Sequence, residues 1–137
     1  MSRKTVHVPK PEPPHRKAWR EAQKHCWLCG TLAINTWPPK IECHEIARGV
    51  HREEAVEESC CWIATCQRCH EAHLDSMPIA RQLALKKIND PENYDRVGVN
   101  RMRNRADEAV TEGEVMVEVC ELQGMADGGY PYPRWRW

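Results

Sequence analysis

The chain has 137 residues, of which 41% are hydrophobic and 29% charged, and its formal net charge is zero. This length suits one compact domain with tails and excludes two ordinary domains. No apolar run is long enough to cross a bilayer and no apolar signal region follows Met1–Lys4, so we expect a soluble, intracellular protein of the cytoplasm without a membrane partner.

The predicted organisation begins with a basic arm over residues 1–18. Residues 1–24 hold seven Lys or Arg against two Glu. The stretch from Val8 to Lys17 has few large apolar groups and several prolines, a composition that favours an extended, solvated backbone. We therefore expect residues 1–18 to be flexible and to lie outside the fold.

Residues 19–76 are expected to form the core, and the pattern within them changes once. Patches rich in β-favouring residues, 40–46 and 61–65, predict short strands. From about Cys69 onward, helix signals dominate. The core is therefore expected to run from two strands into a helix.

A helical extension is predicted over residues 77–124. Apolar residues recur at helical spacing after Pro78, and the Asn-Asp-Pro sequence at 89–91 ends that helix. Thr111 begins a capping box ahead of a last helix, and Gly124 is expected to end it.

The C-terminal tail covers residues 125–137. A turn signal at 127–129 precedes the stretch 130–137, which combines Tyr and Trp rings with Arg guanidinium groups. Such a segment can stack on bases or dock on a protein partner, or its rings can pack back on the domain. We expect a flexible tail that offers a site for a protein partner.

The eight cysteines include two knuckles, Cys26-x-x-Cys29 and Cys66-x-x-Cys69, separated by 36 residues. Without an export signal, metal ligation in a reducing compartment is favoured over disulfides. Zinc accepts a tetrahedron of four sulfurs, and its binding supplies folding free energy to a small domain. We therefore expect a structural Zn²⁺ ion here, with no open position for chemistry. The other cysteines are expected to pack in the interior: Cys43, Cys60, Cys61 and, on the last helix, Cys120.

A histidine pattern accompanies the knuckles. The phrase His44-Glu-Ile-Ala-Arg-Gly49 lies between them, and His70 follows Cys69 directly. This order resembles the HNH endonucleases of phage type, the ββα-metal nucleases in which a CxxC pair, a His-rich strand and a CxxCH turn enclose a catalytic divalent cation. The resemblance covers roughly residues 24–76. It implies an α+β fold, with a small zinc-stabilised ββα-metal core, and DNA as the partner.

Carried over residue by residue, the resemblance makes His44 the first ligand of the catalytic cation and His70 the last. His73, three residues further on the same helix face, could add a third ligand. The implied cation is Mg²⁺ or Mn²⁺. The general base falls on Glu45, and His51, in the same loop, is a further candidate for that role.

Two departures from the family pattern leave alternatives open. Glu45 stands at the usual base histidine, and Cys61 stands where the family has an asparagine that positions the loop. Glu45 could be the base, or it could add an oxygen to the cation site while a histidine acts as base. Another register puts Cys43 at the ligand position and His44 at the base position, but it leaves Glu45 where an apolar strand residue belongs.

An HNH enzyme must also hold phosphate. The resemblance places Arg48 and Arg52 on the loop after the strand, together with His51, and Arg68 lies inside the second knuckle. Arginine side chains contact phosphates without reading the base sequence. We expect the three arginines to bind DNA.

Two functional hypotheses follow. The first is a metal-dependent HNH-type endonuclease that hydrolyses DNA phosphodiester bonds. The second is a catalytically inactive, zinc-stabilised module of HNH descent that binds DNA or a protein in phage-type DNA metabolism, in the host cell if a phage encodes it. His44 and His70 favour the enzyme, which we prefer, whereas Glu45 and Cys61 favour the module.

Overall fold

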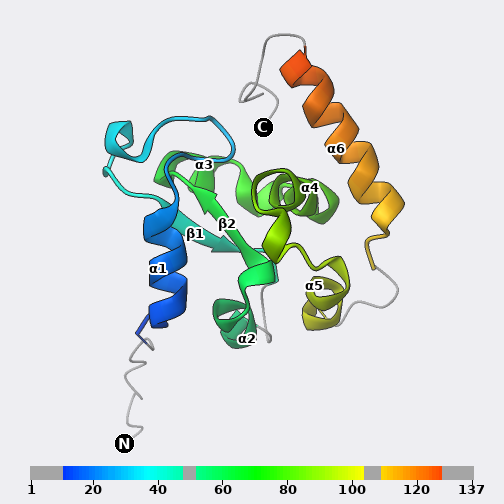
Figure 1. The fold of residues 1–137 in the computed structure, drawn as a ribbon, viewed down its shortest axis with the longest axis horizontal. Coiled ribbons are helices and arrows are strands. Elements are labelled where there is room, and N and C mark those ends of the chain that lie inside the picture. Colours follow the sequence, from blue (N-terminus) through cyan, green and yellow to red (C-terminus); the bar gives the residue numbers. More distant parts are fainter. Residues whose placement is uncertain (1–10, 48–51, 104–108, 128–137) are drawn as a thin grey trace, which may run out of the picture.

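The structure is a computed structural model that describes residues 11–47, 52–103 and 109–127. Figure 1 shows a small two-stranded sheet surrounded by helices. The fold is mixed α and β, in agreement with the predicted class. The elements follow the order α1 (Pro14–Ala22), β1 (Glu42–Glu45), α2 (Arg52–Glu57), β2 (Trp62–Thr65), α3 (Gln67–Ala72), α4 (Ile79–Asn89), α5 (Arg96–Arg103) and α6 (Glu112–Asp127), with short 3-10 turns between several of them.

The sheet pairs β1 with β2 in antiparallel register, with His44 opposite Ile63 and Glu45 opposite Trp62. Both strands lie within the predicted segments, and α3 follows β2 after a single residue. Successive side chains of a strand point to opposite faces. His44 and Ile63 therefore share one face of the sheet, and Glu45 and Trp62 share the other.

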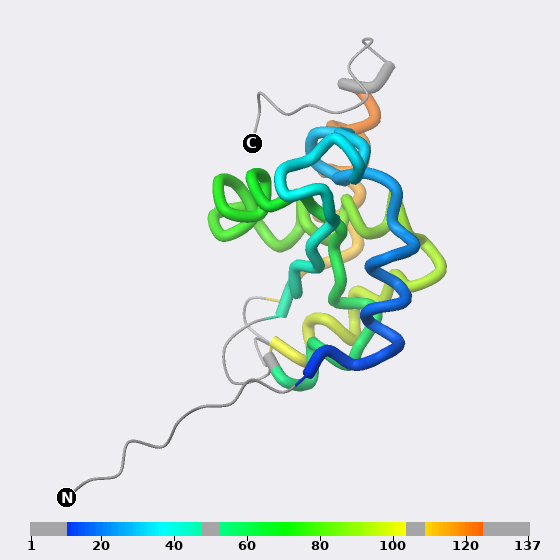
Figure 2. The backbone as a smooth tube through the Cα atoms, turned by 90° about the vertical axis from the view of Figure 1, so that its left-hand side faces the viewer, coloured from blue at the N-terminus to red at the C-terminus, as the bar shows by residue number. Residues whose placement is uncertain are grey.

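Helices cover both faces of the sheet. On the Trp62 face, α1 packs through Trp19, whose ring centre lies 5.5 Å from that of Trp62. On the other face, His44 bonds to His70 of α3 and Gln82 of α4. Figure 2 shows α1 (blue) and α3 (green) on opposite sides of the strands. The sheet, whose strand β1 carries His44, is thus held between α1 on one face and α3 and α4 on the other.

Helix α1 begins at Pro14, inside the segment that we expected to be an extended arm. That prediction was wrong for residues 14–18, and residues 1–10 lie outside the described part of the chain. Proline suits the first turn of a helix because its missing N–H needs no partner there. Trp19 fastens the helix to the core, since its Nε1–H donates to Asp90 Oδ2 at 3.0 Å.

Lys86 on α4 is fully buried beside α1. Its Nζ donates to Asp90 Oδ2 at 2.7 Å and to the Trp62 carbonyl at 2.9 Å. The same Nζ lies 4.8 Å from the centre of the Trp19 ring. Burial lowers the pKa of Lys86, and the Asp90 carboxylate opposes that change. Elements α1, β2 and α4 thus meet at one buried ammonium group.

Replacing Lys86 by methionine is expected to lower the free energy of unfolding by about 3 kcal/mol, because it removes the donor that Asp90 and the Trp62 carbonyl share. Urea denaturation measures this loss. Lys24→Met, at an exposed position after α1, is the matched control and should change stability by less than about 0.5 kcal/mol. Equal stabilities of the two variants would contradict a structural role for Lys86.

In the helical extension, α4 and α6 begin where the sequence predicts, but α6 ends later than predicted. Helix α4 begins directly after Pro78 and stops at the predicted Asn-Asp-Pro sequence. At the start of α6, Thr111 Oγ1 accepts from the N–H three residues on at 3.1 Å, as a capping box requires. The predicted stop at Gly124 was wrong, because α6 continues to Asp127. Glycine commonly ends a helix by adopting a positive φ, but in the described residues the glycine with a positive φ is Gly30, on the cysteine turn after α1.

The cysteines outside the knuckles are buried, with one exception. Cys43, Cys60 and Cys61 lie in the core, as predicted. Cys120 is exposed, so the prediction that it packs in the interior was wrong. It lies on a solvent-facing side of α6, whose buried positions are occupied by residues such as Val119 and Leu122.

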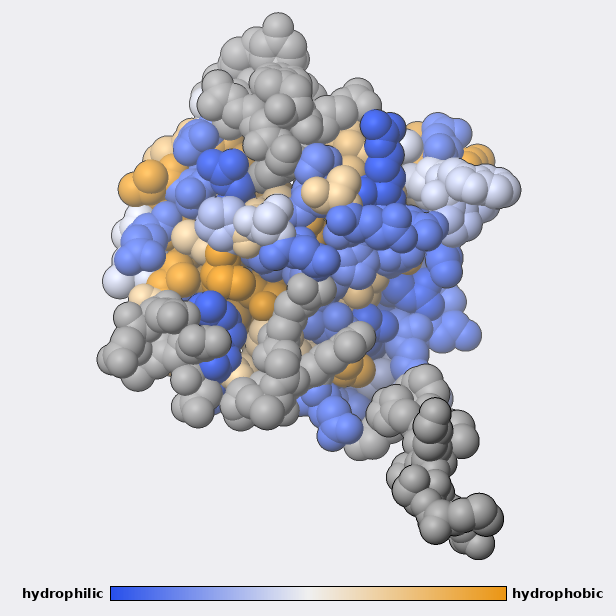
Figure 3. Space-filling view, turned by 180° about the vertical axis from the view of Figure 1, so that it is seen from behind, coloured by the Kyte–Doolittle hydropathy of each residue, from blue (hydrophilic) through white to orange (hydrophobic). Residues whose placement is uncertain are grey.

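The tail segment 128–137 lies outside the described residues, so its protein partner remains a prediction. Figure 3 shows the face opposite to that in Figure 1, where hydrophilic side chains predominate around smaller hydrophobic areas. In residues 11–47, 52–103 and 109–127, no helix combines the length and apolar character that a membrane crossing requires.

Candidate functional site

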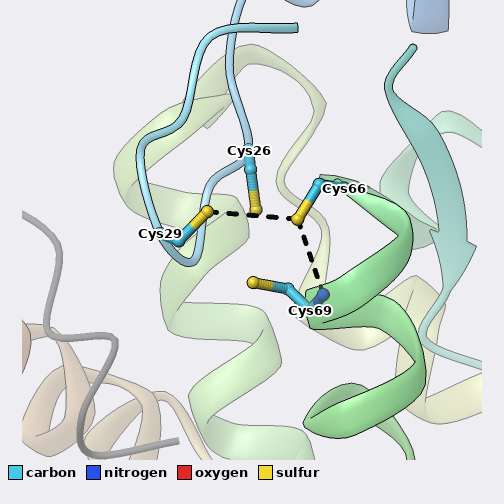
Figure 4. A group of neighbouring side chains, drawn as sticks. All are labelled: Cys26, Cys29, Cys66 and Cys69. Carbon is cyan, nitrogen blue, oxygen red and sulfur yellow. Dashed lines mark hydrogen bonds between the residues drawn. The ribbon is translucent and has the colours of Figure 1, made fainter. Parts of the chain in front are cut away.

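Two tight turns bring four cysteines together. Cys26 and Cys29 lie on the turn after α1, where the Gly30 N–H donates to the Cys26 carbonyl at 2.9 Å. Gly30 has a φ of 74°, a left-handed conformation that favours glycine. Cys66 caps the start of α3, and its Sγ accepts from the Cys69 N–H at 3.5 Å. Figure 4 shows that the four side chains point toward one another.

The four sulfurs have a spacing that suits a metal ion. All four Sγ atoms lie within 4.8 Å of one another, and those of Cys29 and Cys66 are 4.0 Å apart. Zinc–sulfur bonds of about 2.3 Å in a tetrahedron place the sulfurs about 3.8 Å apart. None of the eight cysteines forms a disulfide. A hydrogen bond from Cys69 lowers the pKa of Cys26 to about 4, which supplies a thiolate at neutral pH. The set could hold a metal ion and is compatible with structural zinc.

A second cluster centres on His44 of β1 and His70 of α3. The Nδ1 atom of His44 faces the Nε2 atom of His70 at 3.2 Å, with the two rings nearly perpendicular at 84°. His44 is buried, and His70 is partly exposed. The structure therefore brings together the first and last ligands that the resemblance implied.

Gln82 determines where His44 carries its proton. The amide nitrogen of Gln82 donates to the carbonyls of Met77 at 2.9 Å and Leu74 at 3.4 Å. Its amide oxygen is thus the atom that lies 2.9 Å from His44 Nε2. Because a carbonyl oxygen accepts hydrogen bonds, Nε2 of His44 carries the proton and Nδ1 carries a lone pair.

Glu42 does the same for His70. Its Oε1 lies 2.8 Å from His70 Nδ1, which donates to it, so Nε2 of the neutral ring carries a lone pair. Nδ1 of His44 and Nε2 of His70 thus face each other at 3.2 Å, a distance at which they can share a proton or ligate one cation. Two nitrogen ligands about 2.1 Å from one ion lie about 3.0 to 3.4 Å apart. Metal-bound histidines also donate their second N–H to oxygens of this kind. The pair therefore fits two ligands of a divalent cation.

His73 does not join this pair. It lines a cavity of about 670 Å³ beside the cysteines, together with Cys66 and Arg68. In the described part of the chain, the four cysteines form the group that brings three or more potential ligand atoms together. The prediction of His73 as a third ligand was wrong because α3 ends at Ala72. His73 has a non-helical φ of −126°, so helical spacing from His70 no longer applies.

Glu45 lies on the opposite face of β1 from His44. Its carboxylate accepts a hydrogen bond from Arg16 Nη2 at 2.7 Å. The structure thus bonds Glu45 to Arg16 on the opposite face of the strand, and its role as base or oxygen ligand stays a prediction. Cys43 shares the face of Glu45 and is buried, and burial raises the pKa of its thiol to about 12. The alternative register with Cys43 as a ligand was wrong.

Cys61, at the expected asparagine position, is fully buried, with its Sγ 3.7 Å from Met102 Sδ. Its carbonyl accepts from the Ile46 N–H at 2.8 Å. This bond ties the chain after β1 to the chain before β2. A backbone hydrogen bond thus holds the loop ends at the position where the resemblance implies an asparagine side chain.

The residues expected to contact nucleic acid are only partly described. Arg48 and His51 lie outside the described residues. Arg52 is the first residue of α2, and its side chain is not described. Arg68 lines the cavity beside the cysteines, together with the exposed Trp37. Contacts of these arginines with DNA remain predictions.

Three residues that shape the site were not identified from the sequence. Glu42 lies two residues before His44 on the same face of β1, a spacing that strand alternation could have revealed. Gln82 comes from α4, 38 residues after His44, and no local pattern indicates that contact. Arg16 lies in the segment for which the composition predicts a flexible arm.

A cleft of about 370 Å³ opens beside the histidine pair. Its lining includes His70 and Glu42 together with three basic residues, Arg16 and Arg20 of α1 and Lys40 before β1. Guanidinium groups bind phosphate and carboxylate oxygens through paired N–H donors. The cleft therefore places anion-binding groups next to His70.

Comparisons with known proteins give no information about this site. No protein-family model matches the chain, and neither the curated proteins nor the solved structures contain a match to it. The functional argument therefore rests on the residues of the two clusters.

Proposed function

We propose that this protein is a metal-dependent endonuclease of the HNH type that hydrolyses phosphodiester bonds in DNA. The observation that carries the proposal is the pair of His44 and His70, whose facing nitrogens lie 3.2 Å apart. Their outer nitrogens donate to oxygens of Gln82 and Glu42. The pair joins β1 to α3 within a unit of two strands and a helix.

In this proposal, the residues around the histidine pair bind the metal, orient the rings and contact DNA. A divalent cation, Mg²⁺ or Mn²⁺, would polarise a phosphate oxygen and stabilise the leaving 3′ oxygen. His44 and His70 would hold it. Gln82 and Glu42 keep the two rings in the tautomers and orientations that ligation needs. Arg16, on the cleft wall, offers guanidinium donors to the DNA backbone.

His51 is our proposal for the group that activates the attacking water. A neutral histidine can accept a proton from water. Glu45, the other candidate, is bonded to Arg16 across the sheet from His44. His51 lies seven residues beyond His44 in the sequence.

The four cysteines have a separate role in this proposal. A zinc ion held by four sulfurs has no open position, so it stabilises the scaffold and takes no part in catalysis. The cluster fastens the turn after α1 to the start of α3. Because His70 follows Cys69 directly, a fixed zinc site also fixes the helix that positions His70.

A second function, an inactive zinc-stabilised module that binds DNA or a protein, is favoured by one observation. In the described residues the histidine pair gains no third protein ligand, because the four cysteines form the group of three or more. A site with two protein ligands holds a cation less firmly than one with three. The module hypothesis therefore needs a direct test.

Plasmid nicking separates the two functions. Protein of verified zinc content is expected to convert supercoiled plasmid to the open-circular form with Mg²⁺ or Mn²⁺, and to leave it intact without added metal. Single-stranded and branched DNA are tested in parallel. Failure to cut any of these substrates with either metal would contradict the enzyme and favour the module.

A further inference from the structure

The carboxylate of Glu12 accepts hydrogen bonds from two arginines of α1, Arg16 and Arg20. Arg20 donates to it with two N–H groups, Nε to Oε1 at 3.1 Å and Nη2 to Oε2 at 2.9 Å. Arg16 adds a third donor, Nη1 to Oε1 at 2.8 Å. Paired guanidinium donors of this geometry bind phosphate oxygens as well as carboxylate oxygens. Glu12 thus occupies a site whose chemistry also suits a phosphate group.

Arg16 is held in place from its other side. Its Nη2 donates to Glu45 Oε1 at 2.7 Å and to the Cys43 carbonyl at 3.1 Å. A guanidinium fixed by the sheet in this way keeps its orientation when its partner changes. Its Nε is buried and has no hydrogen-bond acceptor among the described residues, so the carboxylate does not satisfy every donor.

The arginine site shares its cleft with the histidine pair. Glu12, Arg16 and Arg20 line the same cleft as His70 and Glu42. The hydrogen bonds from Arg20 lower the pKa of Glu12, so the carboxylate is charged at neutral pH. Its negative charge offsets the cations where a nucleic-acid backbone would approach His70.

We propose that Glu12 is an internal substitute for a backbone phosphate of DNA and that DNA must displace it to bind at the cleft. The segment before α1 thereby restrains binding. The choice of DNA as the ligand rests on the proposed function, whereas the exchange of a carboxylate for a phosphate rests on the arginine contacts. The exchange leaves neither arginine without an anionic partner, which keeps its cost small.

Removing the charge of Glu12 tests this proposal. Glu12→Gln is expected to tighten binding of a labelled 20-base-pair duplex on the order of tenfold, because DNA no longer competes with a charged group for the arginines. Fluorescence anisotropy of the full chain, in buffer without Mg²⁺ or Mn²⁺, measures the dissociation constant. Glu12→Ala serves as a second variant, and circular dichroism verifies the fold of both.

A matched control separates this site from a general change in charge. Glu21→Gln removes one negative charge from the same helix, at an exposed position whose carboxylate lies 4.0 Å from Lys17 Nζ. It should tighten binding less than about twofold. The double variant Glu12→Gln/Arg20→Gln should bind DNA no more tightly than the wild type, because Arg20→Gln removes the paired guanidinium donors.

The outcomes of this test are independent of cleavage. Equal binding by Glu12→Gln and Glu21→Gln would overturn the proposal, as would the absence of DNA binding by every variant. If Glu12→Gln binds DNA more tightly than the wild type and neither protein cuts DNA, the endonuclease proposal is contradicted and the proposal for Glu12 is supported. If the wild type cuts DNA and Glu12→Gln binds DNA as tightly as Glu21→Gln does, only the proposal for Glu12 is contradicted.

Discussion

Replacing Cys66 by serine is expected to abolish zinc binding and to unfold residues 24–76, with loss of the cooperative thermal transition. Cys66 supplies one of four sulfurs, and its Sγ also accepts the N–H of Cys69 at the start of α3. Structural zinc contributes an apparent binding free energy of about 10 to 16 kcal/mol, as large as the whole stability of most domains. Circular dichroism melting and elemental analysis of zinc measure the two effects.

Cys120→Ser is the matched control for this variant. Cys120 is exposed on α6, outside the four-cysteine group, so the control should keep zinc and melt as the wild type does. Wild-type melting of Cys66→Ser would contradict a structural site. Wild-type protein that contains no zinc after purification without a chelator would remove the scaffold from the proposed function.

The features of the fold that could be predicted have local causes. The strands follow from short runs of β-favouring residues, and Pro78 and Thr111 act within one turn of the helices that they begin. The turn at Cys26–Gly30 likewise follows from a tight cysteine spacing and a glycine that can take a positive φ. In each case the chemistry that forms the element lies within a few residues.

Helix α1 shows why other features could not be predicted. Its proline-rich, basic composition resembles that of a solvated arm, and the contacts that order it come from distant parts of the chain. Trp19 bonds to Asp90, 71 residues further on, and Arg16 bonds to Glu45, 29 residues further on. Tertiary contacts therefore override the local preference of this segment.

The closeness of His44 and His70 could be predicted from the sequence, whereas the residues around them could not. His44 and His70 followed from their order relative to the knuckles. A linear motif does not distinguish the two faces of a strand, which separate Glu45 from His44 and bring Glu42 to His70. Gln82 enters through the packing of α4, which the sequence pattern does not specify.

Replacing His44 or His70 by alanine is expected to reduce plasmid cleavage by at least about 100-fold while preserving zinc content and the thermal transition. Each change removes one nitrogen of the facing pair and leaves the four cysteines intact. His73→Ala is the matched control, since His73 lies beside the cysteine cavity, and it should cut as the wild type does. Isothermal titration with Mn²⁺ should show that His44→Ala and His70→Ala lose an exchangeable site that His73→Ala retains.

Two glutamates on one strand make this test specific to the site. Glu42→Gln weakens the acceptor that orients His70 and should lower cleavage about 10-fold to 100-fold, as the loss of such partners does in metal sites. Glu45→Gln, on the opposite face of β1, should retain most of the activity, because its carboxylate contacts Arg16 and not the histidines. If Glu45→Gln abolishes cleavage and Glu42→Gln does not, Glu45 takes part in the reaction, and the facing histidines form a structural hydrogen bond.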